Sequence, residues 1–153
     1  MNLSKQSLRD DLTAAMKSRD VAVTATLRML LTTVGTTEVA GDEPVVLSHE
    51  QIVAIVRSEV KKRMDAAVLF AQGGRPELAA KERSEIEVLS RYLPAAMPDA
   101  QLAEHVNAAV ALAAADGHTG PKAMGVVMKL LKEAVGGAVD GGRLSAAVKA
   151  ALN

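Results

Sequence analysis

The chain has 153 residues, 18 basic and 18 acidic side chains, and no cysteine. The balanced charge argues against a nucleic-acid binder that is basic over its whole length, and the lack of cysteine excludes disulfides, thiol catalysis and thiolate metal sites within this sequence. Hydrophobic residues make up 49% of the chain, enough for a core, yet no apolar run approaches the roughly 20 residues of a membrane span. We therefore expect a cytoplasmic protein with no membrane segment.

Apolar side chains recur at helical spacing in the first part of the chain and predict two helices. The composition favours helices, because Ala, Leu, Met, Lys, Arg and Glu are common, whereas the chain holds one Phe, one Tyr and no Trp. The first helix is expected over residues 3–18, and Asp20 is placed to cap a second that runs to about Val39. The expected inward-facing residues are Leu8, Leu12, Ala15 and Met16, then Val23, Leu27, Leu30, Leu31 and Val34. Residues 35–47 look loose, which leaves the end of the second helix open.

A third and a fourth helix follow. Ser48 and Gln51 have the spacing of a capping box, and Gly73-Gly74 ends the third helix after about 24 residues. Its expected inward-facing stripe is Ile52, Val53, Val56, Val60, Met64, Ala67, Val68 and Ala71. Pro76 suits the first turn of the fourth helix, and Leu93-Pro94 ends it, because the residue before a proline is pushed out of the α region.

Three shorter helices are expected after a linker over residues 94–98, which prolines bound on both sides. They start at Asp99, at Pro121 and after Gly141-Gly142. Their expected inward-facing residues are Leu102, Val106, Val110 and Ala113, then Met124, Val127, Met128, Leu131 and Val135, then Leu144, Val148 and Leu152. The sequence thus predicts an all-α protein, in which a four-helix N-terminal unit (residues 1–94) is joined by a short proline-bounded linker to a small three-helix C-terminal domain (residues 98–153).

Patterns typical of catalysis or metal binding are nearly absent. His49, His105 and His118 lack the i, i+4 spacing of a helical zinc pair, and we interpret them as surface side chains. The glycine pairs lack the Lys-Ser/Thr of a phosphate-binding loop and are interpreted as helix ends. The acids between Glu77 and Glu87 alternate with basic residues, as on a solvated helix face. We therefore predict no catalytic residue, no metal and no cofactor.

Two features of the N-terminal unit are secondary candidates for anion binding. The run Lys61-Lys62-Arg63 would suit phosphate contacts; alternatively, Glu59 and Asp65 neutralise it as an ordinary exposed face. Arg28 is the single charge between Asp20 and Glu38. A charge buried among Thr, Leu and Met needs a partner, so either an acid such as Glu59 pairs with Arg28, or Arg28 contacts an anion between helices.

The main candidate lies between Thr119 and Asn153, where five basic and two acidic residues leave an excess of +3. The basic residues are Lys122, Lys129, Lys132, Arg143 and Lys149. At about 100° per residue, the first three fall within an arc of roughly 80°, opposite the apolar side of their helix. This lysine stripe either follows a phosphate backbone or is an ordinary solvated face. Because this unit has no aromatic residue for base stacking, RNA contacts would go to backbone and shape.

Several segments together resemble the GatB/YqeY family. They are Thr26-Leu27-Arg28-Met29-Leu30, Glu59-Val60-Lys61-Lys62-Arg63, Gly74-Arg75-Pro76-Glu77-Leu78-Ala79-Ala80-Lys81-Glu82, Glu87-Val88-Leu89-Ser90-Arg91-Tyr92-Leu93-Pro94, Gly120-Pro121-Lys122-Ala123-Met124-Gly125-Val126-Val127-Met128-Lys129 and Ser145-Ala146-Ala147-Val148-Lys149. The resemblance spans nearly the whole chain, and the Tyr-Leu-Pro linker together with the Val-Met-Lys stretch is specific.

The resemblance implies a binding role. In the tRNA-dependent amidotransferase, the B subunit ends in a similar helical tail that engages tRNA, and this chain lacks that enzyme's catalytic domains. The family label is a carbon–nitrogen ligase with glutamine as amido-N-donor. The implied partners are tRNA and a tRNA-amidotransferase or aminoacyl-tRNA synthetase complex. The tail's tRNA contact carries over most directly to Lys122, Lys129, Lys132 and Lys149.

Three functions stay open from the sequence. The chain is a tRNA-binding accessory module, a helical protein-interaction module that binds no nucleic acid, or an amidotransferase component with activity of its own. The first predicts tRNA binding that weakens with salt. Nuclease treatment during a pull-down separates the first from the second. The third function has no support from catalytic residues, because none is identifiable in the sequence.

Overall fold

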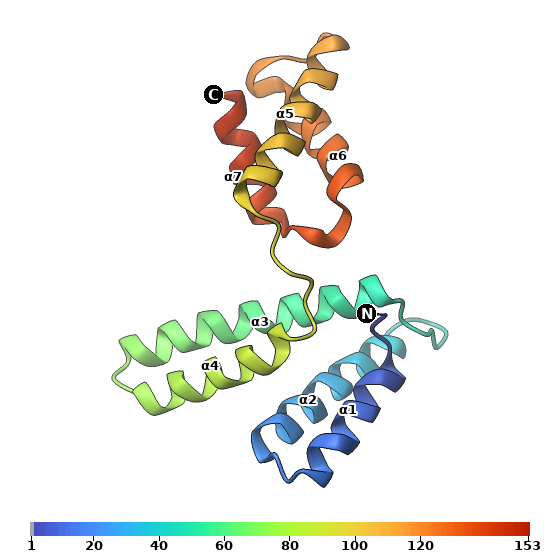
Figure 1. Ribbon diagram of the computed structural model, residues 1–153, viewed down its shortest axis with the longest axis vertical. Helices are drawn as coiled ribbons and strands as arrows, with labels where there is room; N and C mark the ends of the chain where they lie inside the picture. Colours follow the sequence, from blue (N-terminus) through green and yellow to red (C-terminus); the bar gives the residue numbers. More distant parts are fainter. Residues whose placement is uncertain (1) are drawn as a thin grey trace. The chain divides into compact units, whose positions relative to one another are not determined.

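The computed structural model describes residues 2–153, and the chain is helical throughout (Figure 1). The α-helices are α1 (Lys5–Lys17), α2 (Val21–Glu38), α3 (His49–Gln72), α4 (Pro76–Ser90), α5 (Asp99–Ala115), α6 (Met124–Val135) and α7 (Gly141–Leu152). Two short 3-10 helices, η1 (Gly120–Ala123) and η2 (Gly136–Ala138), flank α6. The described residues contain no strand, which confirms the all-α fold class. They form two compact units: one ends at Leu93 and contains α1–α4, and the other is Pro94–Asn153.

The N-terminal unit consists of two helical hairpins. Helix α1 packs on α2 and α3 packs on α4, while α2 also contacts α3 and α4, so that one hairpin lies across the other (Figure 1). Leucine, valine and isoleucine fill the crossing. The buried residues of this core are Leu3, Leu8, Leu27, Leu30, Val34, Leu47, Ile52, Val53, Val56 and Leu89. The helical periodicity of the sequence therefore located most of this core.

Local hydrogen bonds fix where these helices begin and end. The predicted capping box is confirmed: the Ser48 hydroxyl accepts from the Gln51 amide at 3.2 Å, and the Ser48 amide donates to the Gln51 side chain at 2.8 Å. Asp20 caps α2 as predicted, by accepting from the amide of Val23 at 3.1 Å. Pro76 lies in the first turn of α4, and Gly74 takes a φ of 72° after α3, where glycine is favoured.

The C-terminal unit is a three-helix arrangement in which α5, α6 and α7 all contact one another. Its core is aliphatic: Leu102, Val106, Ala109, Ala113, Ala123, Val127, Leu131, Val135, Val139, Leu144 and Val148 are buried. The predicted starts of the last two helices are wrong, since α7 begins at Gly141 and not after Gly141-Gly142. Pro121 was expected to open the sixth helix, but it lies in η1, and α6 begins at Met124. Gly120, with a φ of 65°, turns the chain there, and the first turn after it has 3-10 geometry.

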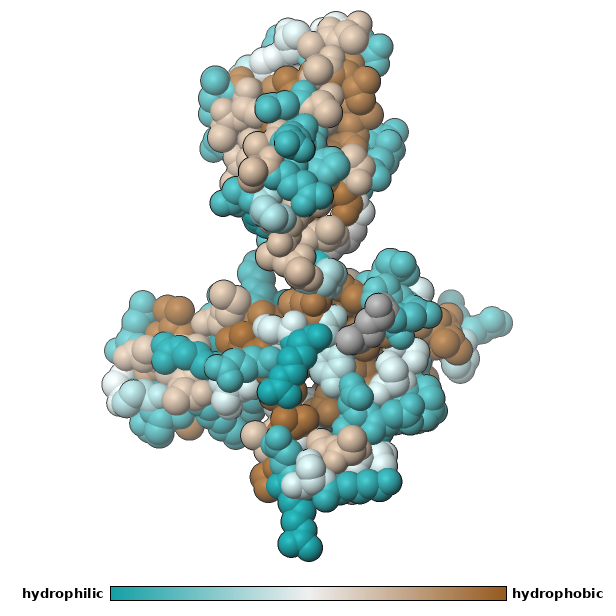
Figure 2. Space-filling view, viewed as in Figure 1, coloured by the Kyte–Doolittle hydropathy of each residue, from teal (hydrophilic) through white to brown (hydrophobic). Residues whose placement is uncertain are grey.

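Four residues predicted to face inward lie at the surface instead. Met16, Met64 and Val68 are 50%, 55% and 53% exposed, and Ala71 is also exposed. Helix α4 covers the face of α3 that carries Arg63 and Ala67, so Met64 and Val68, each about 100° from that face around the helix, stay uncovered. Apolar side chains accordingly reach the surface among hydrophilic ones (Figure 2).

Candidate functional site

The predicted lysine stripe lies on the surface of the C-terminal unit. Helix α6 buries Val127, Leu131 and Val135 against its neighbours. At 100° per residue, Lys129 leaves the helix opposite these residues and Lys132 leaves it at the edge of the apolar face, and both residues are exposed. The apolar spacing that builds the core thus also orients these lysines outward. Lys122, which was expected on the same helix, lies before α6 in η1, so the prediction of one three-lysine helix face is wrong.

Lys122 in η1 and Lys149 in the last turn of α7 are exposed as well. None of the ion pairs found among residues 2–153 involves these two residues or the two lysines of α6. We call Lys122, Lys129, Lys132 and Lys149 the lysine set. Their exposed side chains are accessible to an external anion.

Charge is unevenly distributed along the C-terminal unit. Residues 94–118 hold three acids, Asp99, Glu104 and Asp116, and no Lys or Arg, which gives −3. Residues 119–153 hold five basic and two acidic residues, which gives +3. The unit is neutral as a whole, so its positive charge is concentrated in the part of the chain that contains α6 and α7.

Arg143, the fifth basic candidate, is held by its own unit. Its guanidinium donates to the carbonyl oxygen of Met97 at 2.7 Å and pairs with the carboxylate of Asp99. These bonds connect the first turn of α7 to the segment that leads into α5. Arg143 is therefore less available to an external anion than the lysine set.

The run Lys61-Lys62-Arg63 is divided by the structure. Arg63 is only 6% exposed; its guanidinium donates to Glu59 at 2.6 Å and to Glu85 of α4 at 2.8 Å. Lys62 pairs with Glu59 at 3.0 Å, and Lys61 is exposed. The expectation of an exposed basic run is thus corrected for Arg63, which instead holds α3 to α4.

The titration of this buried cluster follows from its contacts. Burial by itself raises the pKa of Glu59, but the hydrogen bonds from Arg63 and Lys62 outweigh it and bring the pKa below its ordinary value of 4.5. Burial likewise lowers the pKa of Arg63, and the hydrogen bonds to Glu59 and Glu85 reverse that effect and raise it. Glu59 and Arg63 are therefore both charged at neutral pH.

Arg28 differs from both alternatives that assumed it was buried. The residue is exposed, and its guanidinium lies 3.8 Å from the sulfur of Met16. The suggested ion pair with Glu59 is wrong, because Lys62 and Arg63 occupy that carboxylate. The expectation that Arg28 is buried is wrong because the buried face of α2 carries Leu27, Leu30 and Val34, and Arg28 lies outside that face.

The three histidines belong to different elements: His49 to the first turn of α3, His105 to α5 and His118 to the segment after α5. His49 is half-buried, and its Nδ1 accepts a hydrogen bond from the amide of Leu3 at 2.8 Å, so it ties the start of α3 to the segment before α1. The described part of the chain holds no group of three His, Cys, Asp or Glu residues placed to bind a metal. Nor does any helix described for this chain have the length and hydrophobicity for a membrane crossing.

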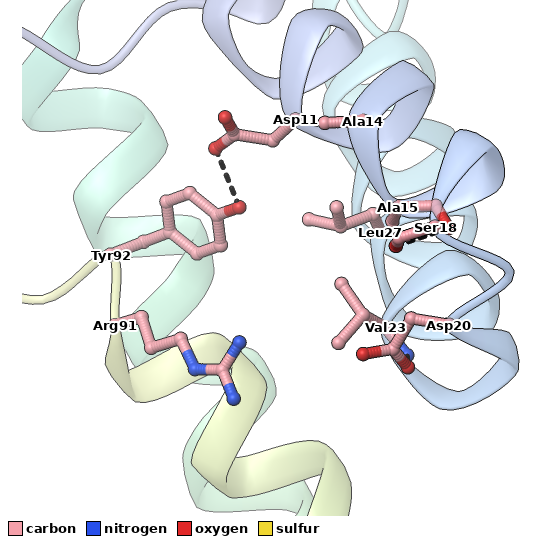
Figure 3. Close-up of a pocket in the computed structure, with 9 residues that line it drawn as sticks. All are labelled: Asp11, Ala14, Ala15, Ser18, Asp20, Val23, Leu27, Arg91 and Tyr92. Carbon is pink, nitrogen blue, oxygen red and sulfur yellow. Dashed lines mark hydrogen bonds between the residues drawn. The ribbon is translucent and has the colours of Figure 1, made fainter.

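A pocket that the sequence did not predict lies within the N-terminal unit, between the α1–α2 hairpin and the residues after α4 (Figure 3). Its volume is about 480 Å³. The Tyr92 hydroxyl donates to the carboxylate of Asp11 at 2.7 Å across it. Burial and this hydrogen bond raise the pKa of Tyr92 above its ordinary value of 10.0, so the phenol keeps its proton. No local pattern links two residues so far apart in sequence, and the pocket could not be found from periodicity.

The chain is similar in sequence to a protein family and to known proteins. The family model described as "Yqey-like protein" matches residues 5–152. "Altered inheritance of mitochondria protein 41, mitochondrial" of Candida glabrata is 28% identical over 87 residues, which cover 57% of this chain and 48% of that protein. The protein of the same name from Eremothecium gossypii is 33% identical over 98 residues, covering 63% of this chain and 52% of that protein.

A third relative, an uncharacterized protein of Schizosaccharomyces pombe, is 31% identical over 87 residues, covering 57% of this chain and 69% of that protein. The match thus spans about half the length of the two mitochondrial relatives and somewhat more of the third. The names of the first two concern mitochondria, whereas the third name gives no location.

Proposed function

The chain belongs to the YqeY-like protein family, and from this premise we propose that it is an accessory module that binds tRNA through the lysine set. In this proposal it contributes binding rather than catalysis, acts in the cytoplasm, and serves a tRNA-amidotransferase or aminoacyl-tRNA synthetase complex. The observation that carries the proposal is that all four lysines are exposed and that no carboxylate of the described chain pairs with them.

The chemistry of the lysine set favours the phosphate backbone as its ligand. A lysine ammonium is a compact point charge that attracts phosphates without reading sequence. The C-terminal unit has no aromatic side chain to stack on a base, so affinity would come from charge and from the shape of the RNA. Each neutralised phosphate releases counterions, and binding would therefore weaken steeply as salt rises.

The test compares two double variants with the same change in net charge. Lys129→Glu with Lys132→Glu reverses two charges of the lysine set, while Lys17→Glu with Lys81→Glu reverses two exposed lysines of the N-terminal unit. Unfractionated tRNA is titrated into each protein, and binding is measured by fluorescence anisotropy over a salt series. The first variant should lose about tenfold or more in affinity, and its affinity should depend less steeply on salt. The second variant should stay close to wild type.

Two results would overturn the tRNA proposal. One is no detectable tRNA binding by the wild-type chain at low salt. The other is an equal loss in both double variants, which would mean that only net charge matters and that the lysine set is no site.

A second function, protein interaction without nucleic acid, is favoured by a different observation. Helix α3 exposes Met64, Val68 and Leu69, at 55%, 53% and 67%, and apolar side chains of this kind are common at protein interfaces. A pull-down with and without nuclease separates the two functions. A partner protein retained after nuclease treatment, and lost in a Met64→Ser, Val68→Ser variant, would favour protein interaction.

A further inference from the structure

The pocket of the N-terminal unit combines opposite charges with an aliphatic wall (Figure 3). On one side lie Arg91 and Tyr92, just after α4; on the other lie residues of α1 and α2. Its volume of about 480 Å³ falls in the range of small-molecule sites. It belongs to a different unit from the lysine set, so its role is independent of the tRNA proposal.

The polar groups around this pocket keep bonding capacity for a ligand. The guanidinium of Arg91 takes part in none of the ion pairs or side-chain hydrogen bonds found among residues 2–153, and Figure 3 shows it beside the cavity. Asp20 uses one carboxylate oxygen to cap α2, and Asp11 uses one oxygen to accept from Tyr92. Each carboxylate thus has a second oxygen that can accept another hydrogen bond.

The opposite wall is aliphatic. Ala15 and Leu27 are buried and Val23 is half-buried, and all three line the pocket (Figure 3). Leu27 has no exposed surface and Ala15 is nearly covered, so a ligand with an aliphatic group would remove apolar surface from water mainly at Val23. A purely cationic ligand would meet the guanidinium of Arg91, and a purely anionic one would meet two carboxylates.

The backbone beside the pocket is held in an unusual conformation. Arg19, between the lining residues Ser18 and Asp20, has a φ of 58°, which is costly for any residue with a Cβ atom. The amide of Asp20 donates to the carbonyl of Ala15 at 3.0 Å and holds this turn closed. A left-handed residue closed by such a bond is a common way for a helix to end, so this turn fixes the position of Asp20 after α1.

We propose that this pocket binds a small aliphatic zwitterion of the free amino-acid class. The ligand carboxylate lies against the Arg91 guanidinium, the ammonium group lies against Asp20, which faces Arg91 at the same end of the pocket (Figure 3), and the aliphatic side chain packs on Val23. Arginine suits the carboxylate because its planar fork can donate two parallel hydrogen bonds.

The experiment titrates four probes into the ¹⁵N-labelled full chain and follows the backbone amide signals by NMR. The probes are L-leucine, 3-methylbutylamine, 4-methylpentanoate and glycine, so that each of the last three removes one feature of leucine. Leucine should shift the amides of Ala15, Val23 and Arg91, with an affinity in the millimolar range. Each other probe should bind about tenfold more weakly, because one charge-assisted or apolar contact is lost.

Matched variants test the residues. Arg91→Gln and Asp20→Asn should each weaken leucine binding about tenfold, and asparagine preserves the helix cap at residue 20. Arg83→Gln in α4 and Asp10→Asn in α1 make the same chemical changes at residues that do not line the pocket, and they should leave binding unchanged.

Three results would overturn the proposal, whatever tRNA binding shows. They are no shift with any of the four probes, equal binding of leucine and 3-methylbutylamine, and unchanged leucine affinity in both pocket variants. Shifts confined to amides outside the pocket would count as the first of these.

Discussion

In α3, the last residue of a basic run points inward, whereas in α6 the lysines at 129 and 132 point outward. Arg63 lies between Glu59 and Glu85 and is buried by α4. Lys129 and Lys132 are exposed and belong to none of the ion pairs of the described chain. A guanidinium can be buried when two carboxylates meet its fork, whereas an ammonium group at the surface needs only water.

The difference assigns the two regions to different tasks. The charge of Arg63 is used inside the N-terminal unit, where it links two helices. Lys129 and Lys132 belong to none of the ion pairs of the described chain, and in our proposal their charges bind the ligand. If this comparison is right, substitutions in α3 should change stability, and substitutions in α6 should change binding.

The comparison is tested most severely by Arg63→Ala. This substitution leaves the carboxylates of Glu59 and Glu85 buried without their main partner, and we expect it to lower the free energy of unfolding of the N-terminal unit by about 3 kcal/mol. Urea unfolding, monitored through the hydrogen exchange of the α3 and α4 amides, measures the loss of stability in the N-terminal unit alone. Lys61→Ala, on the exposed side of α3, is the control. If Arg63→Ala loses as little stability as Lys61→Ala, Arg63 does not hold α3 to α4.

Acid should weaken the same cluster. Because the folded-state pKa of Glu59 is lowered below 4.5, its stabilising contribution is present above that pH and is lost as the pH falls through the lowered pKa. Wild type should therefore lose more stability between pH 6 and pH 3 than Arg63→Ala, in which the shift is smaller. Urea midpoints at a series of pH values measure this, and parallel pH profiles in the two proteins would argue against it.

Arg143→Ala tests the comparison in the C-terminal unit, because Arg143 belongs to the basic part of that unit but is bonded within it. Loss of the bonds to Met97 and Asp99 should lower the free energy of unfolding of the C-terminal unit by about 1 kcal/mol. Its tRNA affinity should fall less than that of the Lys129→Glu, Lys132→Glu variant. Hydrogen exchange of the α5 and α7 amides reports the stability, with Lys149→Ala as the control. Unchanged exchange would show that the bonds contribute nothing.

The smallest effect is expected for Lys129→Ala with Lys132→Ala. Both residues are exposed, so the free energy of unfolding should stay within about 0.5 kcal/mol of wild type. Urea unfolding of the C-terminal unit checks this. A clear loss of stability would show that these lysines support the fold after all, and the contrast with Arg63 would then disappear.

The sequence was sufficient for most helix positions and for much of the core. The Ser48–Gln51 capping box and the Asp20 cap were predicted because a cap bonds residues three apart, and this spacing is visible in the sequence. The inward positions of Leu27, Val56 and Leu131 followed from the helical period. Residues 94–98, the predicted linker, have no regular secondary structure.

The candidate site was predictable only in part. That Lys129 and Lys132 are exposed followed from their place outside the buried face of one helix, which is a local property. Glu59, four residues from Arg63, was visible in the sequence as a neutralising acid, but the other carboxylate partners of Arg63 and Arg143 lie 22 and 44 residues away and were not predicted. Periodicity also misplaced Met64 and Val68, since it cannot tell how wide a face the neighbouring helix covers.

By itself the sequence determined which segments are helical, where they are capped and which side of each is apolar, because these depend on hydrogen bonds and spacings within a few residues. Only the tertiary structure decided which charges are paired and where a cavity forms. Asp11 and Tyr92 are 81 residues apart, and they meet only because one hairpin packs across another. Contacts of this kind depend on how helices pack, and local patterns carry no record of that packing.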